Sequence, residues 1–150
     1  MFEEKLNKIC EISESFGIKQ NKGANKSEIV NFTKAVKKEL DIDIPQQYIV
    51  FLKIINGFEF NGFIVYGIDT YLLDKCHIQS INGLIENNKI WHKNPWQKRY
   101  IFFGDSNISW YVYDLILLKY CELDKPSGNL INSYDSFEHM LNTVLEDAIV

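Results

Sequence analysis

Apolar residues in the first third of the chain recur every three or four positions, which is the spacing of one helical face. One stripe covers residues 2–16, and Gly17 after it is a residue type that often ends helices. Another begins near Asn25, which has capping-box spacing to Glu28, and a third follows Pro45. We therefore expect three helices before residue 56. The apolar residues of the first helix are Phe2, Leu6, Ile9 and Phe16.

Two Asn-Gly pairs follow the third stripe. Asn56-Gly57 ends the helical pattern with the two residue types that best tolerate a positive φ. Asn61-Gly62 separates two short aromatic and β-branched runs, 58–60 and 63–66, which is a strong signal for a β-hairpin. We expect the first pair to end a helix and the second to form a hairpin turn.

Three runs of aromatic and aliphatic residues in the second half of the chain predict the strands of a meander. They cover residues 100–103, 108–113 and 116–123. Turn-forming residues at 104–107 separate the first two runs, and a tight break at Asp114-Leu115 separates the last two.

The segments on either side of this meander have weaker patterns. Residues 68–94 contain helically spaced apolar residues but also Gly83, which disfavours a helix interior, so we expect a loop with a short helix. After a turn at 125–128, Asp135 and Glu138 have capping-box spacing and begin a last helix. The apolar residues of the first segment are Ile78, Ile81, Leu84 and Ile85.

The order of these elements predicts an α+β fold in a single domain over residues 1–150. N-terminal helices and a C-terminal helix are expected to pack against a mainly antiparallel sheet. Along residues 108–113, alternation places Trp110 on one face of the sheet and Tyr111 with Tyr113 on the other. We expect a helix to cover one of these aromatic sets, while the other is open to partial exposure and suits protein binding.

Composition and charge narrow the functional classes. Of the 150 residues, 46% are hydrophobic and 24% are charged, which is typical of a folded domain. The net charge of -4 and the single arginine, Arg99, argue against direct binding of nucleic acid. No apolar run is long enough for a membrane span or a secretory signal, and the cysteines Cys10, Cys76 and Cys121 suit a reducing compartment. We expect a cytoplasmic protein that binds no membrane.

Candidate catalytic motifs are few, and each has a simpler interpretation. Gly104-Asp105-Ser106 is similar to the block that carries the serine nucleophile in one hydrolase family, but a β-turn favours the same residue types. Cys76-His77 lacks the further ligands that a zinc site needs. The sequence also lacks a glycine-rich phosphate-binding motif. We therefore expect no enzyme activity, no cofactor and no metal, and a Cys–His pair formed by the fold stays an open alternative.

Several motifs occur in an order that resembles the SUKH superfamily, and within it the YrhA-like branch. The resemblance is clearest over residues 27–148, and the segment over residues 1–25 departs from it. The motifs are Ile44-Pro45, Tyr48, Phe51-Leu52, Asn56-Gly57, Val65-Tyr66-Gly67, Phe103-Gly104-Asp105, Tyr111-Val112-Tyr113-Asp114 and Ser136-Phe137.

The resemblance implies a small protein-binding module without catalytic residues. Many bacterial members look like immunity proteins, which neutralise a cognate polymorphic toxin in the cytoplasm by direct binding, whereas fungal relatives regulate cell-wall synthesis. We expect this chain to bind a toxin protein, with a nuclease as one candidate because an acidic surface attracts a basic enzyme. The alternative is a regulatory scaffold that binds an endogenous enzyme or a cell-envelope factor. The expected binding residues are Glu59, Tyr66, Asp69, Tyr71, Asp74 and Asp105.

Overall fold

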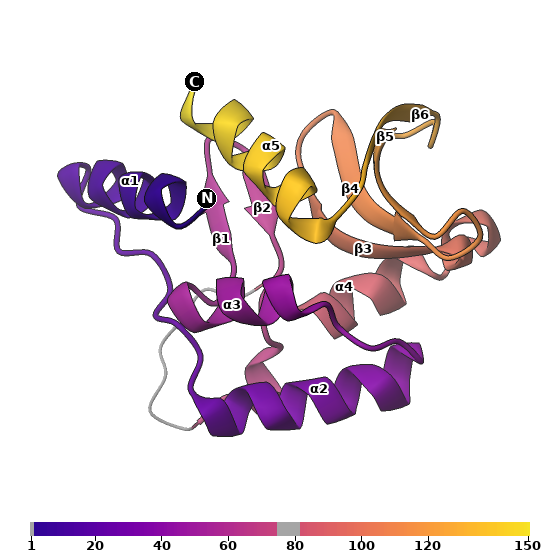
Figure 1. Ribbon diagram of the computed structural model, residues 1–150, viewed down its shortest axis with the longest axis horizontal. Helices are drawn as coiled ribbons and strands as arrows, with labels where there is room; N and C mark the ends of the chain where they lie inside the picture. Colours follow the sequence, from indigo (N-terminus) through magenta and orange to yellow (C-terminus); the bar gives the residue numbers. More distant parts are fainter. Residues whose placement is uncertain (1, 75–81) are drawn as a thin grey trace.

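The computed structural model describes residues 2–74 and 82–150. These residues form five α-helices and a six-stranded antiparallel sheet whose strands follow their order in the chain, so the predicted α+β fold is confirmed (Figure 1). The strands are β1 (Phe58–Phe60), β2 (Phe63–Val65), β3 (Tyr100–Asp105), β4 (Ser109–Asp114), β5 (Lys119–Asp124) and β6 (Leu130–Tyr134). The helices are α1 (Phe2–Ser15), α2 (Lys26–Leu40), α3 (Gln46–Ile54), α4 (Leu84–Trp91) and α5 (Phe137–Ile149), with short 3-10 helices η1 (Thr70–Leu72) and η2 (Pro95–Arg99).

The three N-terminal helices begin and end close to the positions that the apolar stripes predict. Asn25 caps α2: its Oδ1 accepts a hydrogen bond of 2.8 Å from the Glu28 backbone N–H, and the Glu28 carboxylate accepts one of 2.9 Å from the Asn25 N–H. α1 buries its apolar stripe as far as Ile9. Phe16 lies beyond the last turn of α1 and is 77% exposed, so the prediction that it belongs to the buried stripe is wrong.

The two Asn-Gly pairs have their predicted roles, and the first has a further one. Gly57 has a φ of 74° shortly after α3, and Asn56 accepts a hydrogen bond of 2.7 Å through Oδ1 from the Ile68 backbone N–H. Asn61 and Gly62, with φ values of 50° and 81°, form the turn between the paired strands β1 and β2. The first pair therefore also joins the end of α3 to the segment that follows β2.

The strands of the meander differ from the prediction in their bounds. β3 continues through part of the predicted turn as far as Asp105. β5 begins only at Lys119, because the Asp114 carboxylate accepts hydrogen bonds from two backbone N–H groups and closes a turn over residues 115–118. The predicted break at Asp114-Leu115 is therefore too short, and the predicted strand start at Ile116 is wrong.

Three further elements depart from the sequence prediction. β6 is an unpredicted strand, because all but its last residue are exposed and it has no buried alternation. Gly83 precedes α4 as its N-cap instead of lying inside it, while Ile78 and Ile81, predicted in the same helix, lie outside the described residues. α5 is capped by Ser136, whose Oγ accepts a hydrogen bond of 3.1 Å from a backbone N–H of the first turn, and not by Asp135.

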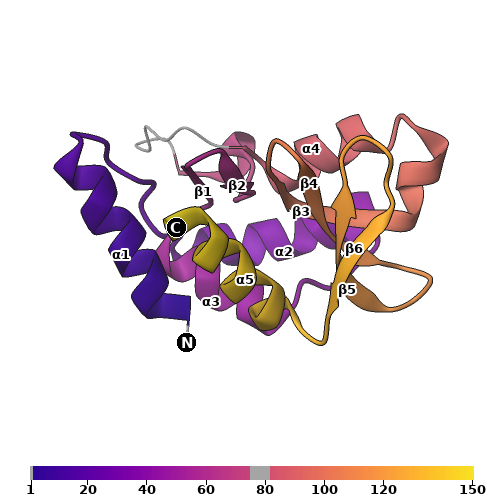
Figure 2. The same ribbon diagram turned by 90° about the horizontal axis from the view of Figure 1, so that it is seen from above.

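Helices cover both faces of the sheet at β4. α5 crosses one face with α1 beside it (Figure 2), and the Phe137 ring of α5 lies 5.3 Å from that of Phe103. On the other face, the Trp91 ring of α4 lies 5.6 Å from that of Trp110. Trp110 is 4% exposed and Tyr111 is 3% exposed, whereas Tyr113 is half-buried, so the expected partial exposure of one aromatic set holds for Tyr113 alone among these three residues.

The side chain of a buried asparagine forms hydrogen bonds with the backbone of β3 at a position where β2 does not pair with it. Asn88 of α4 donates through Nδ2 to the Phe102 carbonyl at 2.9 Å and accepts through Oδ1 from the Phe102 N–H at 2.7 Å. β2 pairs with β3 only at Gly104 and Asp105, so the side-chain amide satisfies backbone groups that β2 does not reach. These two hydrogen bonds fix α4, and with it Trp91, against the sheet.

Candidate functional site

All three tryptophans of the chain meet on the face of the sheet opposite α5. The rings of Trp91 in α4 and Trp96 in η2 lie 5.6 and 5.8 Å from that of Trp110 in β4, both in edge-to-face geometry. We call these residues the tryptophan cluster. Trp110 is buried, Trp91 is half-buried and Trp96 is 45% exposed. The cluster therefore presents one exposed indole on a buried aromatic base.

Lys125, in the turn after β5, holds a positive charge against this base. Its ammonium nitrogen lies 5.6 Å from the centre of the Trp91 ring and 5.8 Å from that of Trp110, within the range of cation–π attraction. The same nitrogen donates to the Ser106 carbonyl at 3.2 Å and lies 3.5 Å from Asp105 Oδ1. The Lys125 side chain is thus fixed by two aromatic rings and two oxygen atoms.

Tyr66 and Asp105, two of the predicted binding residues, meet directly beneath the cluster. The Tyr66 hydroxyl donates to Asp105 Oδ2 at 2.5 Å and accepts a hydrogen bond of 3.2 Å from Trp91 Nε1. Burial and the neighbouring Asp105 carboxylate raise the pKa of Tyr66 well above its usual value, so the hydroxyl keeps its proton. Tyr66 is 1% exposed, so it supports the surface rather than lining it.

Asp69 has a structural task at the start of α4. Its two carboxylate oxygens accept hydrogen bonds from the backbone N–H groups of Ile85, at 3.0 Å, and Glu86, at 2.8 Å. Burial raises the pKa of Asp69, although these backbone donors oppose the shift. At 1% exposure, the carboxylate caps the helix and is not open to a partner.

Tyr71 and Asp74 belong to another part of the surface. Tyr71 in η1 is 67% exposed. The Asp74 carboxylate accepts a hydrogen bond of 2.6 Å from Asn25 Nδ2, and its backbone N–H donates to Glu28 at 3.0 Å. The start of α2, which Asp74 contacts, lies far from the segment that connects α4 to β3 and contains η2 (Figure 1). The predicted residues are therefore not one patch.

Glu59 lies on β1, at the other end of the sheet from β6. Its side chain is exposed, and its backbone carbonyl accepts a hydrogen bond of 3.1 Å from Gln20 Nε2. A hollow of about 480 Å³ beside it is lined in part by Phe16 and Ile18. Its role in binding stays a prediction, separate from the tryptophan cluster.

The chemical motifs have the simpler of their two interpretations where the structure describes them. Ser106 is buried, and its Oγ accepts hydrogen bonds from the N–H groups of Ile108, at 3.4 Å, and Ser109, at 3.2 Å, as in a turn. Burial raises the pKa of the Cys10 and Cys121 thiols, which disfavours the reactive thiolate. Within residues 2–74 and 82–150, no group of three or more potential metal ligands is assembled, and Cys76-His77 lies outside these residues.

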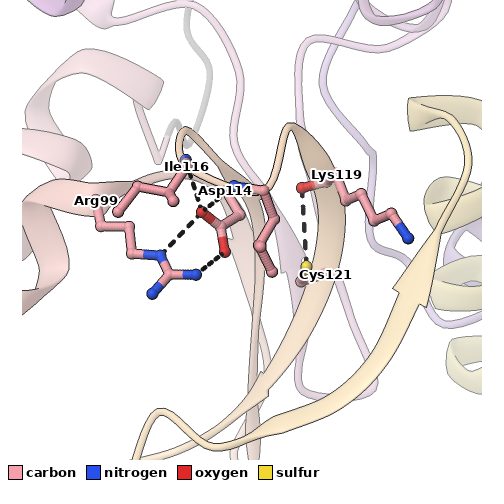
Figure 3. Close-up of polar contacts among 6 residues, drawn as sticks. Arg99, Asp114, Ile116, Lys119 and Cys121 are labelled. Atoms are coloured by element: carbon pink, nitrogen blue, oxygen red, sulfur yellow. Dashed lines mark hydrogen bonds and ion pairs between the residues drawn. The ribbon is translucent and has the colours of Figure 1, made fainter.

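The only arginine of the chain forms a bidentate pair with a buried aspartate (Figure 3). Arg99 donates through Nε to Asp114 Oδ1 at 2.9 Å and through Nη2 to Oδ2 at 2.6 Å. Asp114 Oδ1 also accepts from the backbone N–H groups of Ile116, at 2.9 Å, and Leu117, at 3.1 Å. Burial alone would raise the pKa of Asp114, but the Arg99 guanidinium and these donors hold it below its usual value.

Sequence reasoning missed the tryptophan cluster as a site and missed Lys125 altogether. The tryptophans are separated along the chain, and only the packing of α4 and η2 on β4 brings them together. The available signal was that all of the tryptophans lie between residues 91 and 110. Lys125 gave no signal, because its contacts depend on how the turn after β5 folds back to Ser106.

A family model described as SMI1 / KNR4 family (SUKH-1) matches residues 23–143, which is most of the chain. The chain belongs to this family. The resemblance to the SUKH superfamily is thereby confirmed, while membership of the YrhA-like branch stays a prediction. A search of curated proteins gave no match.

The SMI1 / KNR4 family is generally non-catalytic, and membership is consistent with a protein-binding role in immunity or regulation. The tryptophan cluster lies within the matched residues, whereas α1 lies before them. None of the helices within the described residues combines the length and the apolarity needed to cross a bilayer.

Proposed function

We propose that this SMI1 / KNR4 family protein is a cytoplasmic immunity protein that neutralises a cognate toxin by binding it directly through the tryptophan cluster. Family membership supports the general role of protein binding. The observation that supports the tryptophan cluster as the binding site is the half-exposed indole of Trp96, which packs on the buried ring of Trp110. Tryptophan is among the residue types that contribute most to binding hot spots.

The packing of Trp96 favours it as an anchor. Its ring lies against Trp110 and 6.4 Å from the Tyr100 ring, and a side-chain carbon placed on Gly128 would come within 2.6 Å of it. A ring confined in this way loses little conformational freedom when a partner covers it. Trp96 is therefore suited to fill an apolar pocket of the toxin.

The net charge of the whole chain bears on the class of toxin. The chain carries a net charge of -4, and Lys125 is paired with Asp105, whereas Lys93 and Lys98 on either side of Trp96 are exposed. An acidic binder attracts a basic partner over long distances and speeds association. Because the whole chain is acidic, a basic nuclease is one candidate class of toxin.

Co-expression tests the proposed function. The toxin domain encoded beside this gene is expressed with the wild type, with Trp96→Ala or with Phe16→Ala, a control at an exposed aromatic residue just after α1. We expect the wild type and Phe16→Ala to protect cells and Trp96→Ala to protect them poorly. Equal killing with and without the wild type, and no complex between the purified proteins, would reject the immunity role. A Trp96-dependent complex with an endogenous enzyme or envelope factor would support the regulatory alternative instead.

A further inference from the structure

The turn between β4 and β5 exposes four consecutive apolar residues. Leu115, Ile116, Leu117 and Leu118 have exposed fractions of 38%, 68%, 53% and 68%. We call them the apolar tip. Scattered apolar residues are common on protein surfaces, but a contiguous group of this kind usually marks a contact with another molecule.

The apolar tip is held in one conformation by its own chain. The Asp114 carboxylate accepts hydrogen bonds from the Ile116 and Leu117 N–H groups (Figure 3). In addition, the Leu118 N–H donates to the Asp114 carbonyl at 2.8 Å, and the Leu115 N–H donates to the Arg99 carbonyl at 3.0 Å. Leu118 has a φ of 56°, a left-handed conformation that is unusual for leucine. The tip is therefore ordered before any partner binds, which lowers the entropy cost of binding.

A hollow of about 490 Å³ lies directly beside the apolar tip. Leu118 itself lines it, together with the rings of Tyr113 and Tyr120, whose centres are 4.8 Å apart. Ile42 and Pro45, from the segment between α2 and α3, line the hollow as well. A projecting apolar group and a recess lined by both apolar and polar residues thus occupy one continuous patch.

The charges around the patch complement each other. Lys119, directly after the tip, is exposed. Asp43 and Asp135 line the hollow and are exposed, and the Asp43 side chain is 88% accessible although it lies 3.9 Å from Lys37. The nearby Arg99 charge is already balanced by Asp114. A basic group therefore accompanies the projection, and acidic groups accompany the recess.

We infer that the occupant of this patch is a second copy of the chain. A two-fold axis close to Leu118 would insert Ile116 and Leu117 of each copy into the hollow of the other, and would bring each Lys119 to the partner's Asp43 or Asp135. Because projection and recess are adjacent, the contact closes on itself as a dimer and does not propagate as a filament. The residues that line this hollow do not include Trp96, so this inference goes beyond the proposed function and does not depend on it.

Light scattering and sedimentation velocity over a series of protein concentrations test the dimer. The wild type is expected to approach twice the monomer mass as concentration rises. Leu117→Asp should raise the dimer dissociation constant by roughly tenfold or more. The matched control Ile108→Asp, which alters an exposed apolar residue in the β3–β4 turn, should behave as the wild type. Circular dichroism of each variant checks that the fold is kept.

A charge exchange gives a second test that leaves the apolar tip unchanged. Lys119→Glu should weaken the dimer, and adding Asp135→Lys to it should restore part of the loss. A wild type that remains monomeric at every concentration, or a dimer that Leu117→Asp leaves intact, would overturn the inference. A monomer whose apolar tip instead binds lipid vesicles or another protein would also overturn it, and would assign the tip to that partner.

Discussion

The Tyr66 hydroxyl donates a hydrogen bond to Asp105 Oδ2 across 2.5 Å. Tyr66 directly follows β2, and Asp105 ends β3. Trp91 contacts the tyrosine from α4, and Lys125 contacts the aspartate from the turn after β5. The pair thus joins the sheet to two elements that support the tryptophan cluster, so the exposed surface depends on polar contacts beneath it.

Tyr66→Phe removes this hydrogen bond while keeping the ring. Asp105 then loses its hydroxyl donor in a largely buried site, and we expect the free energy of unfolding to fall by about 1–3 kcal/mol. Urea unfolding monitored by tryptophan fluorescence measures the change. Tyr71→Phe, at a residue that is 67% exposed, is the control and should change stability by less than about 0.5 kcal/mol. Equal stabilities of the two variants would contradict a supporting role for the Tyr66 hydroxyl.

Comparing Gly57→Ala with Gly17→Ala separates the energetic cost of a positive φ from the cost of a steric clash. Both glycines are left-handed, with φ values of 74° and 73°, so each alanine should cost roughly 1 kcal/mol in conformation alone. A Cβ on Gly57 would lie 2.8 Å from the Gly67 nitrogen, whereas one on Gly17 would meet nothing within 4 Å. We expect Gly57→Ala to lose a further ~1–3 kcal/mol in unfolding free energy. Similar losses in the two variants would show that Asn56-Gly57 only ends a helix.

The carboxyl group of Asp114 is expected to make the free energy of unfolding depend on pH. Its pKa is lower in the folded protein than its usual 3.8, despite burial, because Arg99 and two backbone donors favour the carboxylate. A carboxyl group whose pKa falls on folding stabilises the protein above its unfolded pKa and loses that contribution as pH falls through the folded pKa. Asp114→Asn should therefore be less stable at neutral pH and lose stability less steeply in acid. Unfolding free energies measured from neutral pH to below 3.8 test this.

The carboxyl group of Asp69 is expected to change the free energy of unfolding with pH in the opposite direction. Burial raises its pKa on folding, so its contribution to stability is full below the unfolded pKa and is lost as pH rises through the folded value. Asp69→Asn should therefore lose stability more steeply than the wild type as pH falls. If the acid profiles of the Asp69 and Asp114 variants shift in the same direction, the assigned environment of one of these carboxylates is incorrect.

The sequence predicts the elements that depend on local signals. The capping box of α2, the proline before α3 and the Asn61-Gly62 turn act within a few residues, and all three are found. The turn over residues 115–118 is not predictable from its own residues, because a run of apolar residues suggests a strand, whereas hydrogen bonds to Asp114 and to the Arg99 carbonyl close the turn. β6 was missed for a related reason, since its exposed residues lack the alternation of a half-buried strand.

The candidate site was less predictable than the fold. Tyr66 and Asp105 were identified separately, but their hydrogen bond depends on the pairing of β2 with β3. The sequence predicts Asp69 as a binding residue, but its carboxylate is buried because it accepts hydrogen bonds from two N–H groups at the start of α4. Trp96 becomes a candidate only because η2 leaves its indole half-exposed above Trp110.

Titration calorimetry with the purified toxin domain measures whether Trp96 contributes to binding. We expect the wild type and Phe16→Ala to bind with the same affinity. We expect Trp96→Ala to weaken binding by ~30-fold or more, the effect of losing a hot-spot residue worth about 2 kcal/mol. Equal affinity of Trp96→Ala and the wild type, with both correctly folded, would contradict the claim that the tryptophan cluster binds the toxin.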